Sequence, residues 1–277
     1  MPASSHDLLG TYLKDRRAKL DPAAFGLPLT RRRTPGLRRE EVAQRAHVSA
    51  TWYTWLEQGR GGAPSADVLD RIARALMLTE AEREYLIGLG RPPEVRFQET
   101  EGISPRLQRV LDALELHPAI VKTSTWDVVG WNKAAAAVLT DYGLLPKDKR
   151  NILRIIFGDP RSRARQSSWE DVARFVVAAF RADVARAGAS EKAKALVEEL
   201  SAISSDFVAM WRENTVHHCG EGTKHLRLSN GKMVGLEFSY FAVDGRPDLG
   251  LVIYSPSTPN DADKIKALMK EKKKTKR

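Results

Sequence analysis

The 277-residue sequence has a single cysteine, Cys219, so no disulfide can form within the chain. It also lacks a run of about 18 to 20 apolar residues, the length that a membrane-spanning helix needs. Its first ten residues, MPASSHDLLG, lack the basic and apolar regions of a secretory signal peptide. With 42% hydrophobic and 29% charged residues, the composition excludes a wholly disordered or fibrous chain. These features predict a cytoplasmic protein without a membrane partner, and the length predicts about two domains.

The net charge of +10 is concentrated at the two ends of the chain. Residues 1–60 contain 11 Lys and Arg against 6 Asp and Glu, and residues 261–277 contain 8 against 3. Residues 98–260 contain 21 against 20 and are therefore almost neutral. Basic ends on a neutral body indicate a polyanionic partner at the ends and a different role for the middle. Solubility alone is the alternative explanation for this charge.

Proline and glycine positions divide the chain into four parts. Gly90-Arg91-Pro92-Pro93-Glu94 ends any helix before it, and Ser104-Pro105 is typical of the start of a new one. We therefore expect domains at residues 1–92 and 104–260, joined by a linker at 93–103. Residues 261–277 are expected to form a basic tail, in which Ile265, Leu268 and Met269 favour one short helix and the lysine run is frayed.

The first ninety residues have the pattern of five short helices. Apolar spacing and capping residues place them at 7–20, 37–46, 50–58, 66–77 and 80–89. A three-residue turn separates the second and third helices, and small Ala43 permits their close approach, as in a helix-turn-helix. Ala50, Thr51 and Thr54 then face outward, toward a DNA major groove. A plain five-helix bundle without a DNA role is the alternative.

The run from Leu37 to Ser49, followed by Tyr53-Thr-Trp-Leu-Glu-Gln-Gly-Arg60, resembles the helix-turn-helix of Xre/Cro-type repressors. The run RRRTPGLRREEVA at 31–43 resembles the MmyB-like transcription regulators more narrowly. His47 replaces a frequent glycine of the turn, at a position expected to need a positive φ. The resemblance implies binding to double-stranded DNA through Arg31, Arg32, Arg33, Arg38, Arg39, Ser49, Ala50, Thr51, Trp52, Thr54 and Arg60.

Two features of this segment have further interpretations. Arg31, Arg32 and Arg33 either contact phosphate or the minor groove, or form a basic loop without a role. Arg39 stands where many Xre proteins have Gln, and a guanidinium can still meet phosphate. The resemblance also implies a structural ion pair between Arg16 on the first helix and Glu57 at the end of the recognition helix.

The C-terminal part reads as strands, then helices, then strands, which predicts an α+β domain with an antiparallel sheet. Residues 119–123 and 126–131 favour a hairpin, and Asn132 is expected to cap a helix at 133–139. Longer helices are expected at 168–187, 190–203 and 206–214. The Asn230-Gly231 turn predicts a second hairpin from strands at 225–228 and 233–243, followed by a last strand at 250–254.

This order resembles the MmyB-like ligand-binding domain, a PAS-like fold, through segments at 126–132, 151–157, 205–211 and 250–254. The resemblance implies a buried apolar pocket for a small fatty-acid-like ligand and a homodimer. Arg154 and Arg181 are candidates to bind a carboxylate, although both can equally be surface arginines. Large side chains that either line this pocket or simply fill the core are Trp126, Trp131, Phe157, Phe175, Phe180, Phe207, Met210, Trp211, Phe238 and Tyr240.

Other functions are weakly represented. His217-His218-Cys219, with His225, could bind metal or haem, but only one cysteine is present and Gly220 and Gly222 indicate a loop. No phosphate-binding glycine loop, HExxH or GxSxG motif occurs, so we expect neither an enzyme nor a required cofactor. A PAS-like domain that serves only dimerisation or protein interaction is the remaining alternative.

Overall fold

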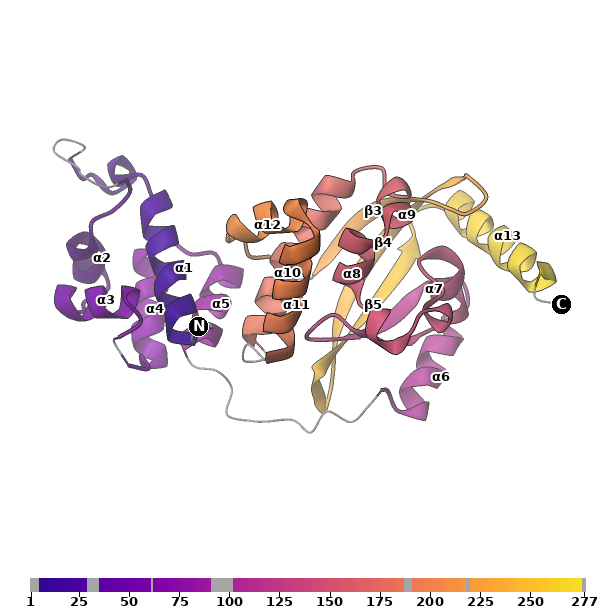
Figure 1. Ribbon diagram of the computed structural model, residues 1–277, viewed down its shortest axis with the longest axis horizontal. Coiled ribbons are helices and arrows are strands. Elements are labelled where there is room, and N and C mark those ends of the chain that lie inside the picture. The colour runs from indigo at the N-terminus through magenta and orange to yellow at the C-terminus, as the bar shows by residue number, and fades with distance from the viewer. Residues whose placement is uncertain are drawn as a thin grey trace. The chain divides into compact units, whose positions relative to one another are not determined.

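The computed structural model describes residues 5–28, 35–60, 62–90, 102–186, 191–217 and 220–275. The chain divides into two compact units (Figure 1). The N-terminal unit comprises Met1–Val95 with two later segments, Arg181–Glu191 and Glu213–His218. The C-terminal unit comprises Arg96–Phe180, Lys192–Arg212 and Cys219–Arg277.

The N-terminal unit is helical, as the sequence predicts. Leu9, Leu13, Tyr53 and Leu56 are fully buried in its core. Ser49 and Ser65 accept hydrogen bonds from the first-turn amides of α3 and α4, so both helices begin where the sequence places their caps. Its elements are α1 (Ser5–Lys19), η1 (Pro22–Phe25), α2 (Arg39–Arg45), α3 (Ala50–Glu57), α4 (Ala66–Ala75) and α5 (Glu80–Gly90).

The turn between α2 and α3 has the expected backbone conformation. His47 has a φ of 52°, which confirms the positive φ inferred at this position. Val48 donates its amide to the Ala43 carbonyl at 2.9 Å, which closes the turn against α2. Ala43 and Ala46 are buried where the two helices meet. The small residues therefore allow the close approach that a helix-turn-helix requires.

The N-terminal unit extends beyond the first ninety residues. Ala182, Ala185 and Val216 belong to the same buried cluster as the core of α1, α3 and α4. The Lys19 ammonium donates to the Glu213 carbonyl at 2.9 Å, in the second added segment. Ala182 and Ala185 lie on α10 (Trp169–Arg186), so the last residues of this helix are part of the N-terminal unit.

The C-terminal unit is built on a five-stranded antiparallel sheet with strand order β2-β1-β5-β4-β3, which confirms the α+β class. Gly231 has a φ of 82° and closes the predicted β3–β4 hairpin. The elements not yet bounded are α6 (Pro105–Ala113), β1 (Ala119–Thr123), β2 (Val128–Trp131), α7 (Lys133–Val138), η2 (Tyr142–Leu144), η3 (Lys147–Lys149), α8 (Ile152–Gly158), α9 (Pro160–Ala164), α11 (Glu191–Ile203), α12 (Ser205–Arg212), β3 (Glu221–Arg227), β4 (Met233–Val243), β5 (Arg246–Pro256) and α13 (Pro259–Thr275).

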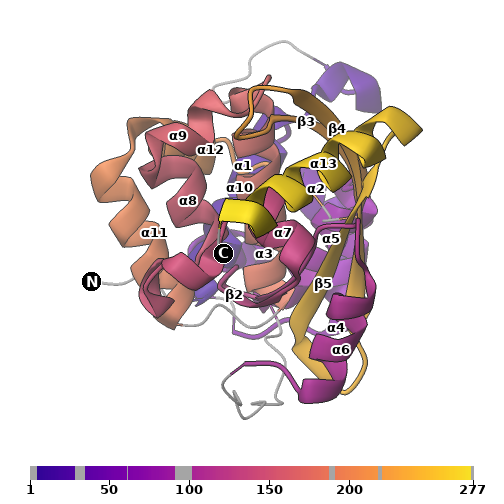
Figure 2. The same cartoon turned by 90° about the vertical axis from the view of Figure 1, so that its right-hand side faces the viewer.

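The sheet separates two cores of unequal size. On one face, α6 packs through Leu111 against Val121 and Leu249. On the other face, Ile120, Leu236 and Val252 form a larger core with α7 and α13. Figure 2 shows the same division, with α6 on one side of the sheet and α8 to α12 on the other. The cavity described below opens on this second side.

Asn132 fastens the start of α7 to its neighbours. Its side-chain oxygen accepts the amides of Ala119 at 3.1 Å and Ala135 at 2.8 Å. Its amide group donates to the carbonyls of Leu111, Leu114 and His117. One buried side chain thus joins the end of α6, the start of β1 and the N-terminus of α7, and confirms the predicted cap.

Three expectations about elements are corrected. The helix α13 runs continuously to Thr275, so the lysines at 270–274 lie on a helix and not in a frayed tail. The strand β3 begins at Glu221, four residues earlier than predicted, and β5 begins at Arg246. The helices α8 and α9 were not predicted, because their short lengths give little periodic signal. Within the described residues, no helix is long and apolar enough to cross a membrane.

Candidate DNA interface and ligand pocket

The exposed face of α3 is the candidate DNA-reading surface. Tyr53 and Leu56 point into the core, and the i, i+4, i+7 set opposite them, Thr51, Trp55 and Gln58, is exposed. Trp55 is 50% exposed, which is unusual for a large aromatic residue. Trp55 and Gln58 were not among the predicted contacts, although the helical period that places Thr51 outward also places them there.

The other predicted residues of α3 have structural roles. Ser49 is exposed and caps the helix by accepting the Trp52 amide. Ala50 and Trp52 are half-buried against the core of the unit. The Thr54 hydroxyl donates to the Ala50 carbonyl at 2.8 Å, so its hydrogen is already used within the helix. Of the predicted α3 residues, Thr51 is therefore the one whose exposed side chain is best placed to contact a base.

Glu57 at the end of α3 forms its buried ion pair with Arg17. The predicted pair with Arg16 is therefore wrong by one residue. Arg17 Nε lies 2.6 Å from Glu57 Oε1, and its Nη2 lies 3.1 Å from Oε2. Arg17 also donates to the Leu37 carbonyl at 2.7 Å, and Arg39 Nε binds Glu57 Oε2 at 2.7 Å. The Glu57 side chain is only 1% exposed, so its negative charge is compensated by these two guanidinium groups and not by water.

Arg16 binds elsewhere because adjacent residues of a helix point about 100° apart. Its Nη1 donates to Glu82 Oε1 on α5 at 2.6 Å, and the guanidinium also donates to the Asn214 carbonyl. Arg16 therefore fastens α1 to α5 and to the segment at 213–218, within the N-terminal unit.

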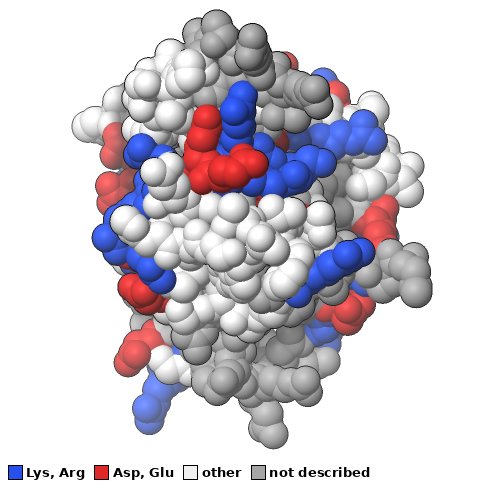
Figure 3. Space-filling model, turned by 90° about the vertical axis from the view of Figure 1, so that its left-hand side faces the viewer, with Lys and Arg blue, Asp and Glu red and all other residues white. Residues whose placement is uncertain are grey.

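Basic side chains lie around the uncharged face of α3. Arg38 and Arg60 are exposed, and the Arg39 side chain is 40% exposed while it pairs with Glu57. Figure 3 shows this end of the N-terminal unit, where Lys and Arg border an uncharged patch and acidic groups lie among them. Arg31, Arg32 and Arg33 lie outside the described residues. The arrangement suits a protein whose basic rim meets phosphate and whose centre meets bases.

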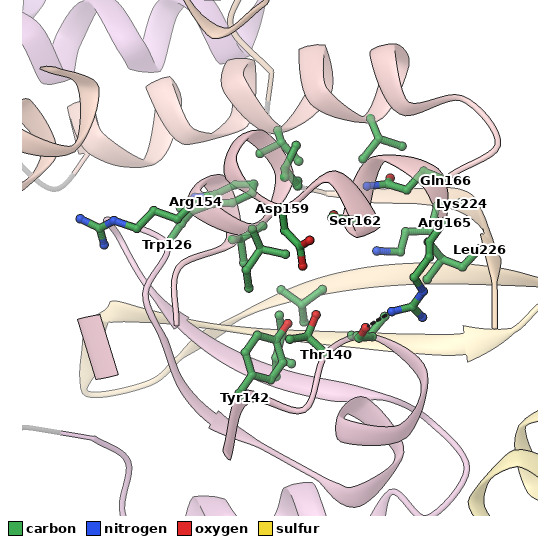
Figure 4. Close-up of a pocket in the computed structure, with 18 of the residues that line it drawn as sticks. Trp126, Thr140, Tyr142, Arg154, Asp159, Ser162, Arg165, Gln166, Lys224 and Leu226 are labelled. Atoms are coloured by element: carbon green, nitrogen blue, oxygen red, sulfur yellow. Dashed lines mark hydrogen bonds between the residues drawn. The ribbon is translucent and has the colours of Figure 1, made fainter. Parts of the chain in front are cut away.

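The C-terminal unit contains a cavity of about 1200 Å³ between the sheet and the helices above it (Figure 4). Aliphatic and aromatic side chains form most of its walls. The sheet contributes Ile120, Leu226, Phe238 and Val252, and the helices contribute Ile152, Ile155, Val172, Phe175 and Val176. This volume is large enough for a drug-sized or lipid-sized molecule.

The two ends of the cavity differ in charge balance. Arg154 lies at one end, where it forms a bidentate pair with Glu199 at 2.6 to 3.1 Å, and this pair lowers the Glu199 pKa. Arg165 and Lys224 lie together at the opposite end (Figure 4). The Lys224 ammonium stands 4.7 Å from the centre of the Tyr254 ring. Desolvation, reinforced by the charge of Arg165, lowers its pKa to about 8.

Four of the predicted pocket residues line the cavity: Trp126, Arg154, Phe175 and Phe238. The others do not line it. Phe157, Phe207 and Trp211 pack against one another and against Trp169 and Phe180 at ring-centre distances of 5.2 to 6.0 Å. Trp131 packs on Tyr142, at a ring-centre distance of 5.6 Å. The members of the predicted set away from the cavity are Trp131, Phe157, Phe180, Arg181, Phe207, Met210, Trp211 and Tyr240.

A metal centre finds no support in the part of the chain that the structure describes, where no three His, Cys, Asp or Glu side chains cluster. His218 and Cys219 lie outside that part. His225 is an exposed residue of β3.

Comparison with known families assigns both units. Residues 8–86 match a helix-turn-helix domain, and residues 103–269 match the MmyB-like transcription regulator ligand-binding domain. The chain belongs to the MmyB-like transcription regulators. No curated protein matches it. This MmyB-like regulator therefore combines a DNA-binding unit with a domain for a small-molecule ligand, and the cavity of about 1200 Å³ lies within the matched ligand-binding domain.

Proposed function

We propose that this MmyB-like regulator binds a fatty-acid-like molecule in the cavity and changes its affinity for an operator in response. The supporting observation is the cavity itself, whose walls are largely aliphatic and aromatic and whose volume is about 1200 Å³. An aliphatic tail gains about 25 cal/mol for each Å² of apolar surface that it buries there. Basic side chains stand at both ends of the cavity, with Arg154 at one end and Arg165 and Lys224 at the other, where a head group would lie.

The helix α10 supports the proposed link between ligand and DNA. Val172, Phe175 and Val176 on its first half line the cavity. Arg181–Arg186 on its last turns belongs to the N-terminal unit, where Ala182 and Ala185 enter the core. A ligand that favours one position of α10 therefore acts on an element that both units share. The ligand changes DNA affinity only to the extent that it binds one arrangement better than the other.

We further propose that the protein acts as a homodimer. Helix-turn-helix dimers place two recognition helices about 34 Å apart, in successive major grooves. The proposal requires a two-fold symmetric operator and predicts that sedimentation equilibrium finds two protein chains for each operator duplex. A monomer on a single half-site would refute it, and the DNA-binding role would remain.

The identity of the ligand and its binding in the cavity are tested with the purified full-length protein. Mass spectrometry of organic extracts should detect a long-chain acid at close to one molecule for each chain. Titration with dodecanoic acid then measures binding to the wild type and to Val172→Trp, which fills the cavity from α10. Glu170→Trp, at an exposed position of the same helix, is the matched control. We expect binding to be lost in Val172→Trp and kept in Glu170→Trp. Equal binding to all three proteins would place the ligand outside the cavity.

A further inference from the structure

Lys224 and Arg165 form a cationic end of the cavity that no carboxylate of the described chain neutralises directly. Among the residues that the structure describes, no carboxylate bonds to Lys224, whose ammonium stands 4.7 Å from the centre of the Tyr254 ring. Arg165 donates from Nε to the Arg227 carbonyl at 3.0 Å and from Nη1 to the Leu139 carbonyl at 2.6 Å. It also donates to the Val138 carbonyl. Three of its five N–H groups are thus used, all on neutral carbonyls.

These contacts fix Arg165 in place and compensate its charge only in part. Val138 and Leu139 end α7, so their carbonyls lie at the partly negative end of a helix dipole. The carboxylate whose charge acts on Arg165 is Asp159, which already caps α9 and binds Arg161 at 3.2 Å. The positive charge of Arg165 and Lys224 is therefore held at the edge of an apolar cavity, where an anion is the group that compensates it best.

The other cations of the cavity have partners of their own. Arg154 is paired with Glu199, and Lys272 donates to the carbonyls of Ala136 and Ala137. Lys122 stands over the rings of Trp126 and Tyr240, at 4.2 and 5.1 Å. Next to the Arg165 and Lys224 pair, Gln166 Oε1 is buried and accepts no hydrogen bond from the described residues (Figure 4). This oxygen is an acceptor, so it requires a donor such as water or a ligand hydroxyl, and the charge of an anion is compensated by Lys224 and Arg165 alone.

We propose that Lys224 and Arg165 bind the anionic head group of an amphiphilic ligand whose tail fills the apolar part of the cavity. The inference rests on the proposed function. It specifies the charge of the ligand's head group and the end of the cavity at which that group lies. The shared chemistry is a carboxylate or a phosphate monoester on an aliphatic chain. Each charge-assisted hydrogen bond to such a group contributes more than a neutral one.

The titration of Lys224 gives the site a pH dependence. An anion beside the ammonium raises its pKa again, so binding is strongest while Lys224 is protonated and weakens as the pH rises above about 8. Other titratable or charged groups also line the cavity. They are Lys122, Asp141, Tyr142, Lys149, Arg154, Asp159, Arg161, Arg165, Asp171, Glu199, Glu221, Tyr254 and Lys272.

Calorimetric titration of the full chain with dodecanoate, dodecyl phosphate and dodecanol tests the assignment. The wild type should bind at least one of the anions about tenfold more tightly than the alcohol, which is about 1.4 kcal/mol. Lys224→Met should remove that preference and leave dodecanol affinity within about twofold, which also shows that the variant is folded. Lys232→Met removes an exposed lysine that does not line the cavity and should change neither affinity. Whichever anion binds more tightly identifies the head group.

The outcomes separate this inference from the proposed function. Equal binding of acid and alcohol to the wild type would refute the anion site and leave the apolar ligand in place. Retention of the preference in Lys224→Met, or its loss in Lys232→Met, would also refute it. If no amphiphile bound, the proposed function itself would fail. Between pH about 7 and 9.5, anion affinity should fall in the wild type while alcohol affinity stays constant.

Discussion

Glu57→Ala removes the anion that holds two arginines at the end of the recognition helix. The Arg17 side chain is 7% exposed and its guanidinium would lose both carboxylate oxygens, keeping only the Leu37 carbonyl. Breaking one partner of a buried pair costs about 3–5 kcal/mol because the remaining charge stays uncompensated. Arg39, at 40% exposed, can turn to water, so the cost comes chiefly from Arg17.

Hydrogen exchange of the full chain measures this cost locally. Amides of α1 and α3 should lose protection by roughly two to four powers of ten, since about 1.4 kcal/mol is a factor of ten. Asp67→Ala is the matched control: its carboxylate is 76% exposed and pairs with Arg71 at 3.2 Å, so its loss should cost at most about 1 kcal/mol. The double variant Arg17→Met with Glu57→Leu should recover part of the loss, because it buries no unpaired charge. Equal protection in Glu57→Ala and Asp67→Ala would refute the reasoning.

Four further results are expected. Thr51→Ala should change the preferred DNA sequence, with about 1–3 kcal/mol lost at one base pair, and unchanged selection from a random duplex pool would exclude a base contact. Charge reversal of Arg31, Arg32 and Arg33 should weaken binding to all sequences and flatten its salt dependence; normal binding would remove the loop from the interface. His47→Gly should leave stability within about 1 kcal/mol of the wild type, whereas His47→Val should cost about 1–2 kcal/mol at the positive φ, and equal melting of the two would contradict this. Asn132→Ala should cost about 3–5 kcal/mol through five lost hydrogen bonds, against almost nothing for exposed Asn260→Ala in chemical denaturation.

Helix periodicity predicts most of the helices of the N-terminal unit. It also indicates that Arg17, and not Arg16, faces Glu57. Gly10, Leu13 and Arg17 follow one stripe of α1, and a Cβ at Gly10 would lie 2.5 Å from the Glu57 carbonyl oxygen. The stripe that faces Glu57 therefore ends at Arg17. The family resemblance implies an arginine on the first helix but does not distinguish Arg16 from Arg17. The four-residue spacing from buried Leu13 selects Arg17.

The cavity was harder to predict because its residues come from distant elements. The sequence predicts that large aromatic side chains line the cavity. Phe157, Phe207 and Trp211 instead pack in a cluster of their own, and aliphatic residues form much of the cavity wall. Lys224 was missed because β3 begins at Glu221, earlier than the strand predicted from His225. With the true start, alternation puts Gly222, Lys224 and Leu226 on one face. Polar residues at both ends of this strand had hidden that alternation.

The central claim is that ligand and DNA affect each other through this chain. The direct test is titration of dodecanoic acid into the full-length protein with and without an operator selected from random duplexes. Coupling is reciprocal, so the factor by which DNA changes acid affinity must equal the factor by which the acid changes DNA affinity. We predict a common factor of about ten, or about 1.4 kcal/mol. Identical acid affinity with and without the operator would contradict the account.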